Sequence, residues 1–343
     1  MKLEPANTGE FLQGTFLSHP GCLHDEEQFA LVGPEYLLEA QSSAADSGDL
    51  IVLEAHFSSV DHPLDPEMPV FRHIPGAVQI HPSYLEAGLN REKYYPHYDH
   101  PEESNIMKGR ALTDALEHLG IHPESTIVVY GSDPDGVMAA ARLIWGLMYA
   151  GVKRVRLLDG GIEAWIGHGQ TAEMSITSVW DVITPPRRSS SWSLQEGFLA
   201  SSESIRQHVA NASDSPVGKL IDVRTDGEWN GSTPQKYTFF SRAGHIRGAI
   251  HQGDWDNLLD GTSKRLARHL AVVARRWRDQ GILDPEVENG KTPLTFYCGT
   301  GWRSSIAFLV AHLLGFRSQN YEEGFFGWSH YPEHPVERPS TLD

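Results

Sequence analysis

Short apolar segments alternate with amphipathic helical patterns in the first half of the chain. Apolar, β-branched runs at residues 50–55, 126–130 and 155–158 are typical of buried strands. Between them, apolar residues recur at helical spacing through residues 112–119 and 138–149, and a glycine ends each pattern. Strands joined by helices predict a parallel sheet that is covered by helices on both faces, with right-handed crossovers.

The second half of the chain repeats this order of elements. Residues 219–223 and 294–297 match strands of the first half, and a helical pattern spans residues 266–277. The sequence His-Ile-Arg-Gly-Ala-Ile from His245 echoes His-Ile-Pro-Gly-Ala-Val from His73, which lies 172 positions earlier. We interpret the repeat as an internal duplication of a unit of roughly 140 residues, which is the size of a domain.

The two copies predict an α/β protein of two tandem domains, each built on its own parallel sheet. The first domain is expected to span residues 1–172 and the second residues 199–343. Residues 173–198 are rich in Pro, Ser and Arg, which is typical of a linker that runs over a domain surface.

The composition is that of a soluble globular protein with a strong negative charge. Of 343 residues, 40% are hydrophobic and 21% charged, and the formal net charge is −17. This charge disfavours nucleic acid and acidic membrane surfaces as partners, and no apolar run is long enough to span a bilayer. We expect a cytoplasmic location; a mitochondrial one in a eukaryote would need a transit peptide, and none is evident.

Cysteine and histidine usage argues against a metal or a disulfide framework. The chain has two cysteines, Cys22 and Cys298, too few for disulfide-based stabilisation or for a cysteine-based zinc site. The 18 histidines are scattered rather than placed at ligand spacing. We therefore expect no metal site.

The most distinctive stretch follows the strand at residues 294–297. Cys298 comes directly after this strand, and a helical pattern begins a few residues later. Such a turn offers unpaired N–H groups and the positive end of the helix dipole, which favour a thiolate and attract anions. Gly299 and Gly301 allow the loop to curl, and Arg303 adds a positive charge. The pattern predicts an anion-binding nucleophile loop; the alternative is that the cysteine is a small buried apolar residue.

The two copies differ at this loop. Counting from the strand, the first copy has Gly131 at the position of the cysteine and Gly136 at the position of the arginine. Its turn also carries Asp133 and Asp135, which would repel an anion. The first copy is therefore expected to keep the architecture and to lack the nucleophile.

Several further motifs occur in a fixed order. They are the two His-Ile-x-Gly-Ala segments from His73 and His245, the Gly-Gly-x-x-x-Trp element at Gly160 to Trp165, Asp222-Val223-Arg224, Glu228-Trp229-x-Gly231, and the six-residue loop from Cys298 to Arg303. From about Phe29 to Glu337 the chain resembles the tandem-domain rhodaneses, the thiosulfate and 3-mercaptopyruvate sulfurtransferases. The resemblance implies two tandem rhodanese-like domains, of which only the second is catalytic.

The resemblance also implies a mechanism that needs no cofactor. The Cys298 thiolate would attack the sulfane sulfur of a small anionic donor and become a persulfide, and a nucleophilic acceptor would then take the sulfur. The acceptor would be cyanide or a thiol, including a thioredoxin-like or other thiol protein. A persulfide carrier or sulfur-relay adaptor without turnover of its own is an alternative.

Site residues follow from the same motifs. We expect Cys298 as nucleophile with Arg303 as its catalytic partner, Arg224, Gly299, Thr300, Gly301, Trp302 and Arg247 as substrate-binding residues, and Asp222 and Ser304 as structural support. The alternative for Arg224 is an ion pair with Asp222 or Glu228 that braces the loop.

Loop length distinguishes sulfur from phosphate chemistry within this resemblance. In the related cell-cycle dual-specificity phosphatases, one more residue separates the Cys from the Arg and widens the loop. Here Arg303 follows Cys298 by five positions, and Ser304 occupies the next one. The smaller loop favours sulfur and disfavours phosphatase activity.

The donor is less well determined. Mercaptopyruvate enzymes usually carry Cys-Gly-Ser-Gly-Val-Thr, whereas this chain has Trp302 and Arg303 at the last two positions. The thiosulfate enzymes of animals place basic residues where this chain has Gly299 and Thr300. Because Arg303 can neutralise a dianion and Glu228 would disfavour a carboxylate, thiosulfate is the favoured donor and 3-mercaptopyruvate the alternative.

Overall fold

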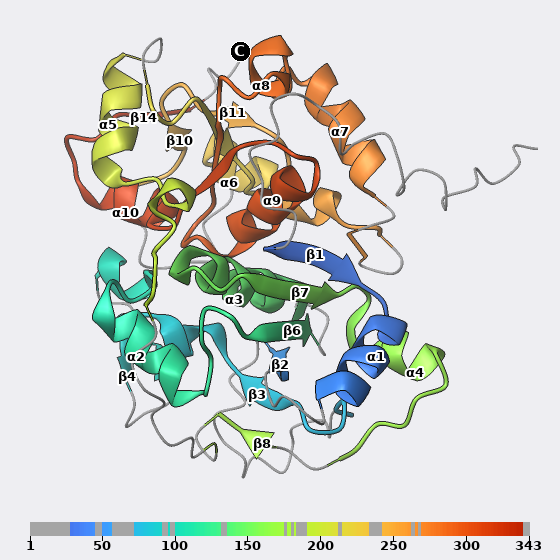
Figure 1. Ribbon diagram of the computed structural model, residues 1–343. Helices are drawn as coiled ribbons and strands as arrows, with labels where there is room; N and C mark the ends of the chain where they lie inside the picture. Colours follow the sequence, from blue (N-terminus) through green and yellow to red (C-terminus); the bar gives the residue numbers. More distant parts are fainter. Residues whose placement is uncertain are drawn as a thin grey trace, which may run out of the picture.

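The computed structural model describes most of the chain between residues 28 and 338 (Figure 1). The described residues are 28–44, 50–56, 72–90, 95–96, 100–131, 136–174, 177–179, 182, 191–211, 215–232, 242–261, 265–266 and 269–338. Cys22, Asp133, Asp135, the first residues considered for targeting signals and much of the expected linker lie outside these ranges.

The first domain is built on a six-stranded parallel sheet. Across the sheet the strands are β1 (Phe29–Val32), β7 (Arg154–Leu158), β6 (Thr126–Gly131), β2 (Leu50–Ala55), β3 (Val78–Ile80) and β8 (Thr177–Ser178). The short antiparallel pair β4 (Leu89–Asn90) and β5 (Tyr95–Pro96) lies outside this sheet.

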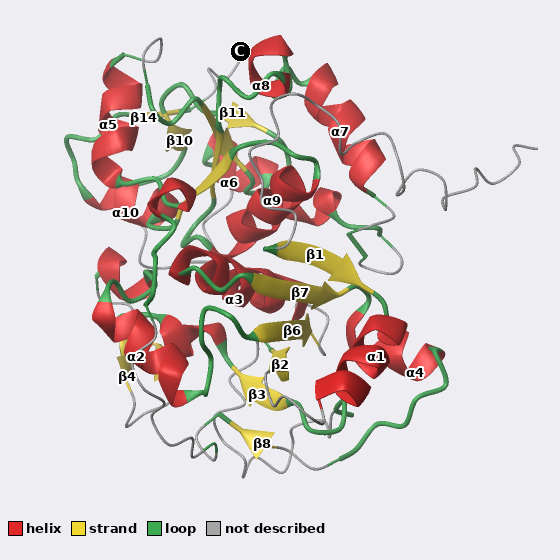
Figure 2. Ribbon diagram, in the orientation of Figure 1, coloured by secondary structure: helices red, strands yellow, loops and turns green. Residues whose placement is uncertain are grey.

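Helices cover both faces of this sheet (Figure 2). Alternate residues of β6 point to opposite faces, so Val128 and Tyr130 pack with helices α1 (Pro34–Ala44) and α4 (Gly161–Gly167), whereas Ile127 and Val129 lie in the cluster that contains α2 and α3. α2 spans Arg110–His118 and α3 spans Gly136–Ala150, with short 3-10 turns at Pro82–Leu85 and Pro101–Ser104 before them.

The second domain repeats this plan with a smaller sheet. Its four parallel strands are β11 (Ile250–His251), β9 (Lys219–Asp222), β12 (Leu294–Tyr297) and β13 (Ser318–Tyr321), and β10 (His245–Ile246) pairs separately with β14 (Val336–Glu337). Its helices are α5 (Ser202–Ala210), α6 (Asp226–Asn230), α7 (Leu270–Asp279), α8 (Pro285–Glu288), α9 (Trp302–Leu313) and α10 (Gly324–His330), with 3-10 turns at Glu196–Phe198 and Trp255–Leu258. The predicted α/β fold of two tandem domains is confirmed.

One pair of hydrogen bonds identifies the equivalent positions of the copies. The hydroxyl of Tyr130 accepts from the backbone N–H of Ile74 at 3.0 Å, and the hydroxyl of Tyr297 accepts from that of Ile246 at 3.1 Å. Tyr130 directly precedes Gly131 near the end of β6, and Tyr297, the last residue of β12, directly precedes Cys298. Gly131 in the first copy is therefore the structural equivalent of the cysteine in the second, as the sequence comparison predicted.

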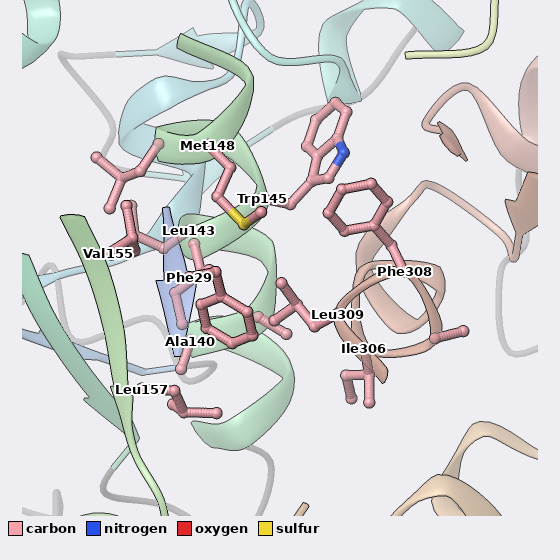
Figure 3. Packing of buried hydrophobic residues seen from close by; sticks show 14 of the residues in the cluster. Phe29, Ala140, Leu143, Trp145, Met148, Val155, Leu157, Ile306, Phe308 and Leu309 are labelled. Carbon is pink, nitrogen blue, oxygen red and sulfur yellow. The ribbon is translucent and has the colours of Figure 1, made fainter. Parts of the chain in front are cut away.

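The two domains share one hydrophobic core. Helices α3 and α9 face each other between the two sheets, α3 from the first domain and α9 from the second (Figure 1). Figure 3 shows Ala140 and Leu143 of α3 opposite Ile306 and Leu309 of α9, with Phe29 of β1 beside them. These side chains are almost completely buried, so the junction between the domains has the character of a domain interior.

One strand and the start of one helix differ from the sequence prediction. Strand β1, which pairs with β7 at the sheet edge, was not predicted, because only Phe29 of its four residues is fully buried. The helix expected from residue 266 begins at Leu270. Leu266 is buried ahead of it, where its N–H donates to the Asp159 carboxylate of the first domain at 2.9 Å. An apolar residue at helical spacing is here a loop residue that packs between domains.

Candidate active site

Cys298 lies at the carboxyl end of the central strand β12, in the short loop before α9. Strand β12 is buried along its whole length between β9 and β13, and the Cys298 side chain is only 1% exposed. In parallel sheets, ligands bind beyond the carboxyl ends of the strands. The structure therefore places this thiol where the fold offers a binding site.

Two glycines allow the loop to pack closely against the turn that follows β13. Gly301 has a φ of 82°, and a Cβ there would lie 2.7 Å from the Cα of Glu322. Gly324 has a φ of 57°, and its Cβ would lie 2.7 Å from the carbonyl oxygen of Cys298. Only glycine fits both the left-handed conformation and the space. The role of Gly324 was not predicted.

The first turn of α10 holds the carbonyl groups of the loop. The N–H of Phe325 donates to the Cys298 carbonyl at 2.8 Å, and that of Phe326 donates to the Gly299 carbonyl at 3.0 Å. In a trans peptide the N–H points opposite to the C=O. The N–H groups of Gly299 and Thr300 therefore point away from α10, on the side where an anion can bind.

Buried polar side chains of α9 and β13 form a network that supports the Cys298 thiol. The Ser304 hydroxyl lies 3.6 Å from the Cys298 Sγ and 2.7 Å from Asn320 Oδ1, so its single proton can go to either acceptor. The Asn320 amide donates to the Gly301 carbonyl and to the Ser305 hydroxyl, both at 3.1 Å. The contact between Ser304 and Cys298 favours the supporting role expected of Ser304, which stays a prediction. Asn320 was missed because it comes from the neighbouring strand β13.

Arg303 forms a bidentate ion pair with Glu228. Arg303 Nη1 and Nη2 lie 2.7 and 2.8 Å from the two carboxylate oxygens. Glu228 also accepts from the Thr225 backbone N–H in a capping box at the start of α6. Burial raises the pKa of Glu228, but hydrogen bonds and charge from Arg303 outweigh burial and lower the pKa to about 2.

This pair corrects one prediction about charge. Arg303 was expected to offer a positive charge to a dianion, and Glu228 was expected to repel a carboxylate as a separate charge. Because the two side chains neutralise each other, neither argument about the donor holds as stated.

Arg224 forms a second buried ion pair, with Asp222. Its guanidinium pairs with the Asp222 carboxylate at 2.6 Å, donates to the Gly244 carbonyl at 2.7 Å and lies 4.1 Å from the ring of Phe325. Both charged side chains are completely buried. These contacts favour the alternative, an ion pair with Asp222 that braces the loop. Donor binding by Arg224 and the supporting role of Asp222 both stay predictions.

The remaining predicted residues divide into two groups. Thr300 lies in the loop and Trp302 is the first residue of α9, and their side chains are 7% and 8% exposed. The Trp302 indole donates to Glu86 of the first domain at 2.8 Å. Arg247 lies on the surface, where it pairs with Glu337 at 2.9 Å. Among the residues that the structure describes, no hydrogen bond or ion pair joins Arg247 to the loop, so its role in donor binding stays a prediction.

The equivalent site of the first copy has a different chemistry. Glu54 takes the place of Asp222, pairs with His73 at 2.5 Å and accepts from the Tyr130 hydroxyl at 2.9 Å. A Cβ on Gly131 would lie 2.7 Å from the Cα of Gly136. The first copy thus leaves no room for a side chain at the position of the nucleophile.

Comparison with protein-family models identifies the class to which this fold and loop belong. The rhodanese-like domain model matches twice, at residues 60–168 and 205–331. The chain belongs to the rhodanese-like family, and its relatives place it among the sulfurtransferases.

Relatives and solved structures cover most of the chain. Thiosulfate sulfurtransferase YnjE of Escherichia coli is 30% identical, over 93% of this chain and 68% of that protein. Sulfur carrier protein TtuD of Thermus thermophilus is 27% identical, over 77% of this chain and 85% of its own length. The wild-type structure of EanB is 28% identical with a TM-score of 0.71, over 90% of this chain and 69% of EanB. Another structure in this group is described as an anaerobic ergothioneine biosynthesis enzyme from Chlorobium limicola.

Within the described part of the chain, neither a membrane span nor a metal cluster is found. No helix there is long and apolar enough to cross a membrane. No group of three or more His, Cys, Asp or Glu side chains in the same residues could hold a metal ion.

Proposed function

We propose that the protein is a sulfurtransferase that carries a sulfane sulfur on Cys298. The observation that supports this most directly is the position of Cys298 in a short loop whose carbonyl groups are held by α10 while the N–H groups of Gly299 and Thr300 face the other side. A thiolate and, later, the terminal sulfur of a persulfide are anions that such N–H groups stabilise. The arrangement therefore favours both the thiolate and the persulfide of Cys298.

The proposed cycle has two nucleophilic displacements. The Cys298 thiolate attacks the outer sulfur of thiosulfate, a Cys298 S–S bond forms, and the S–S bond of the donor breaks with its electron pair leaving on sulfite. A cyanide ion or a thiolate then attacks the outer sulfur of the persulfide. The S–S bond to Cys298 breaks, the product is thiocyanate or a new persulfide, and the enzyme thiolate is restored.

Thiosulfate is the proposed donor, and 3-mercaptopyruvate remains the alternative. The paired Arg303 and Glu228 supply no net charge to either donor, so the loop N–H groups and the helix dipole are left as the anion-binding elements. The preference for thiosulfate rests on the similarity to YnjE, a thiosulfate sulfurtransferase. With 3-mercaptopyruvate, the same attack would release pyruvate.

Two alternatives for the acceptor are supported by relatives. TtuD is named a sulfur carrier protein, which supports a carrier that passes its persulfide to a thiol protein, such as a thioredoxin-like one. EanB structures include complexes with hercynine and ergothioneine, a cysteine persulfide, and variants of a threonine two positions after that cysteine. This chain also has a threonine, Thr300, two positions after Cys298. This similarity supports hercynine, a trimethylated histidine, as a second candidate acceptor.

The two copies of the domain have different roles in this proposal. We propose that residues 199–343 form the catalytic domain, that residues 1–172 form a domain without a nucleophile, and that residues 173–198 link them, with Thr177–Ser178 of the linker adding strand β8 to the first sheet. The family model matches residues 60–168, within the first proposed domain, and residues 205–331, within the second. Neither range includes the proposed linker.

One set of assays tests the donor and the acceptor together. Thiocyanate formation is measured with thiosulfate and with 3-mercaptopyruvate, using the wild type and Cys298→Ser, and hercynine with polysulfide is supplied in a parallel reaction. We expect turnover with thiosulfate that the Ser variant lacks. A persulfide without thiocyanate formation would favour the carrier, ergothioneine formation would favour the second candidate, and activity of the Ser variant would refute the mechanism.

A further inference from the structure

The indole of Trp302, the first residue of α9 after the loop, reaches into the first domain. Its Nε1 donates to a carboxylate oxygen of Glu86 at 2.8 Å, across 216 positions of sequence. Glu86 directly follows the 3-10 turn Pro82–Leu85, and the ring of His81 lies 5.4 Å from the Trp302 ring. A residue of the domain without a nucleophile thus binds a residue of the active loop.

Arg142 of α3 holds Glu86 in place. Its Nε lies 3.2 Å from the Glu86 carboxylate, and both side chains are completely buried. One terminal nitrogen of Arg142 donates to the Ser104 carbonyl at 2.8 Å and to the Glu322 carboxylate at 3.1 Å. Arg142 therefore joins two acids, one from each domain.

Glu322 contacts the loop from the other side. Its Cα packs against Gly301 so closely that a Cβ on the glycine would lie 2.7 Å away. Its carboxylate turns into the first domain, where it accepts from the Ile106 backbone N–H at 2.8 Å and pairs with Arg142. Arg142 is thus linked to the loop twice, through Glu86 to Trp302 and through Glu322 to Gly301.

A purely stabilising role explains this network poorly. Removing three charged groups from water costs several kcal/mol per ion, and replacing buried ion pairs by apolar side chains is often neutral or stabilising. Arg142 is the one charged residue of α3, whose other residues are apolar, aromatic or glycine. Directional hydrogen bonds give the groups that they join a defined position, and apolar packing does not.

We propose that Glu86 and Arg142 are positioning residues that fix the active loop from the first domain, through Trp302 and Glu322. This inference rests on the proposed function of Cys298 for its consequence in turnover. It gives the first domain a role in the chemistry, although that domain lacks the nucleophile.

The test is a double-mutant cycle of Glu86→Leu and Trp302→Phe in a Cys22→Ser background, which leaves Cys298 as the single thiol. The cycle compares kcat, KM, the rate of Cys298 alkylation by iodoacetamide and the urea midpoint. We expect each single change to lower kcat about tenfold, because small misplacements of reacting groups are costly, and to change KM much less. The double variant should be no slower than the slower single variant.

The chain offers a matched control. Trp192 of the proposed linker donates through Nε1 to the carboxylate of Glu117 in α2 at 2.8 Å, which is the same kind of bond. Glu117→Leu and Trp192→Phe should lower the urea midpoint without changing alkylation or kcat. Arg142→Met, which keeps an apolar stem in the core, should reproduce the kcat loss of Glu86→Leu.

Two outcomes would overturn the inference. Additive effects on kcat and alkylation in the Glu86 and Trp302 cycle would show that the two residues act independently. Unchanged kcat and alkylation with a lower urea midpoint would show a merely structural role. Alkylation needs no sulfur donor, so if the wild type proves inactive with every donor, the proposed function fails while the positioning of Cys298 is still measured.

Discussion

Arg303, five positions after Cys298, donates two hydrogen bonds of 2.7 and 2.8 Å to the carboxylate of Glu228. Arg303 is the second residue of α9 and Glu228 belongs to the first turn of α6, so this pair joins the segment after β12 to the segment after β9. The positive charge next to the nucleophile is therefore balanced within the protein.

The Glu228 carboxylate should make stability depend on pH in the acid range. Its pKa in the folded protein is about 2, below its ordinary value of 4.5. A lowered folded pKa means that the contribution, about 3 kcal/mol, is fully present above pH 4.5 and is lost as the pH falls towards 2. Urea unfolding between pH 7 and pH 3 measures this loss.

Glu228→Gln is the variant that isolates this contribution. It should unfold more easily at pH 7 by about 3 kcal/mol, because it leaves the buried Arg303 without a charged partner. Its stability should also fall less than that of the wild type on acidification. An identical pH dependence in the two proteins would contradict the assignment to Glu228.

Arg224 should matter for stability rather than for donor affinity. Arg224→Gln leaves the carboxylate of Asp222 buried and unpaired, so we expect the free energy of unfolding to fall by about 3–5 kcal/mol. Arg247→Gln removes an exposed pair and should cost less than about 1 kcal/mol. Chemical denaturation compares the two variants. A stable Arg224 variant with a raised KM for thiosulfate would support the donor-binding role.

The Ser304 hydroxyl should favour the thiolate form of Cys298. Ser304→Ala removes a donor that lies 3.6 Å from the Sγ, and a hydrogen bond to a charged group is worth about 1.5–3 kcal/mol. We expect alkylation by iodoacetamide at neutral pH to slow about tenfold. Ser305→Ala is the control, since the Ser305 hydroxyl donates to the Gly301 carbonyl. Equal effects of the two variants would indicate general loosening of the loop.

A cysteine placed in the first copy should not create a second active site. Gly131→Cys forces a Cβ to within 2.7 Å of the Gly136 Cα, so the backbone must shift and the melting temperature should fall. In a Cys298→Ser background this variant should form no thiocyanate. Gly167→Cys serves as the control, because a Cβ there meets nothing within 4 Å.

The local part of this site could be predicted from the sequence, but few of its long-range contacts could. The strand, the cysteine, the two loop glycines and the helix start are consecutive, so their pattern could be read directly. The partners of Arg303 and Trp302 lie 75 and 216 positions away, and no local pattern encodes such a contact. Glu228 was considered only for its charge on a substrate, because its distance to Arg303 depends on how α6 and α9 pack.

The same distinction explains the fold. The duplication and the central strands could be predicted, because buried parallel strands are continuous apolar runs. Strand β1 was missed, since it is short and mostly half-buried at a sheet edge. The use of Arg142 in the shared core could not be predicted either, because a charged residue in an otherwise apolar helix does not specify its partners.

The central claim is that Cys298 carries the transferred sulfur. Incubation of the wild type and of Cys298→Ser with thiosulfate, followed by mass spectrometry of the intact protein and of the peptide that contains residue 298, tests it directly. We predict that the wild type gains the mass of one sulfur atom on Cys298, that cyanide removes it with formation of thiocyanate, and that the Ser variant gains nothing. Sulfur on any other residue, or thiocyanate formation by the Ser variant, would contradict the account.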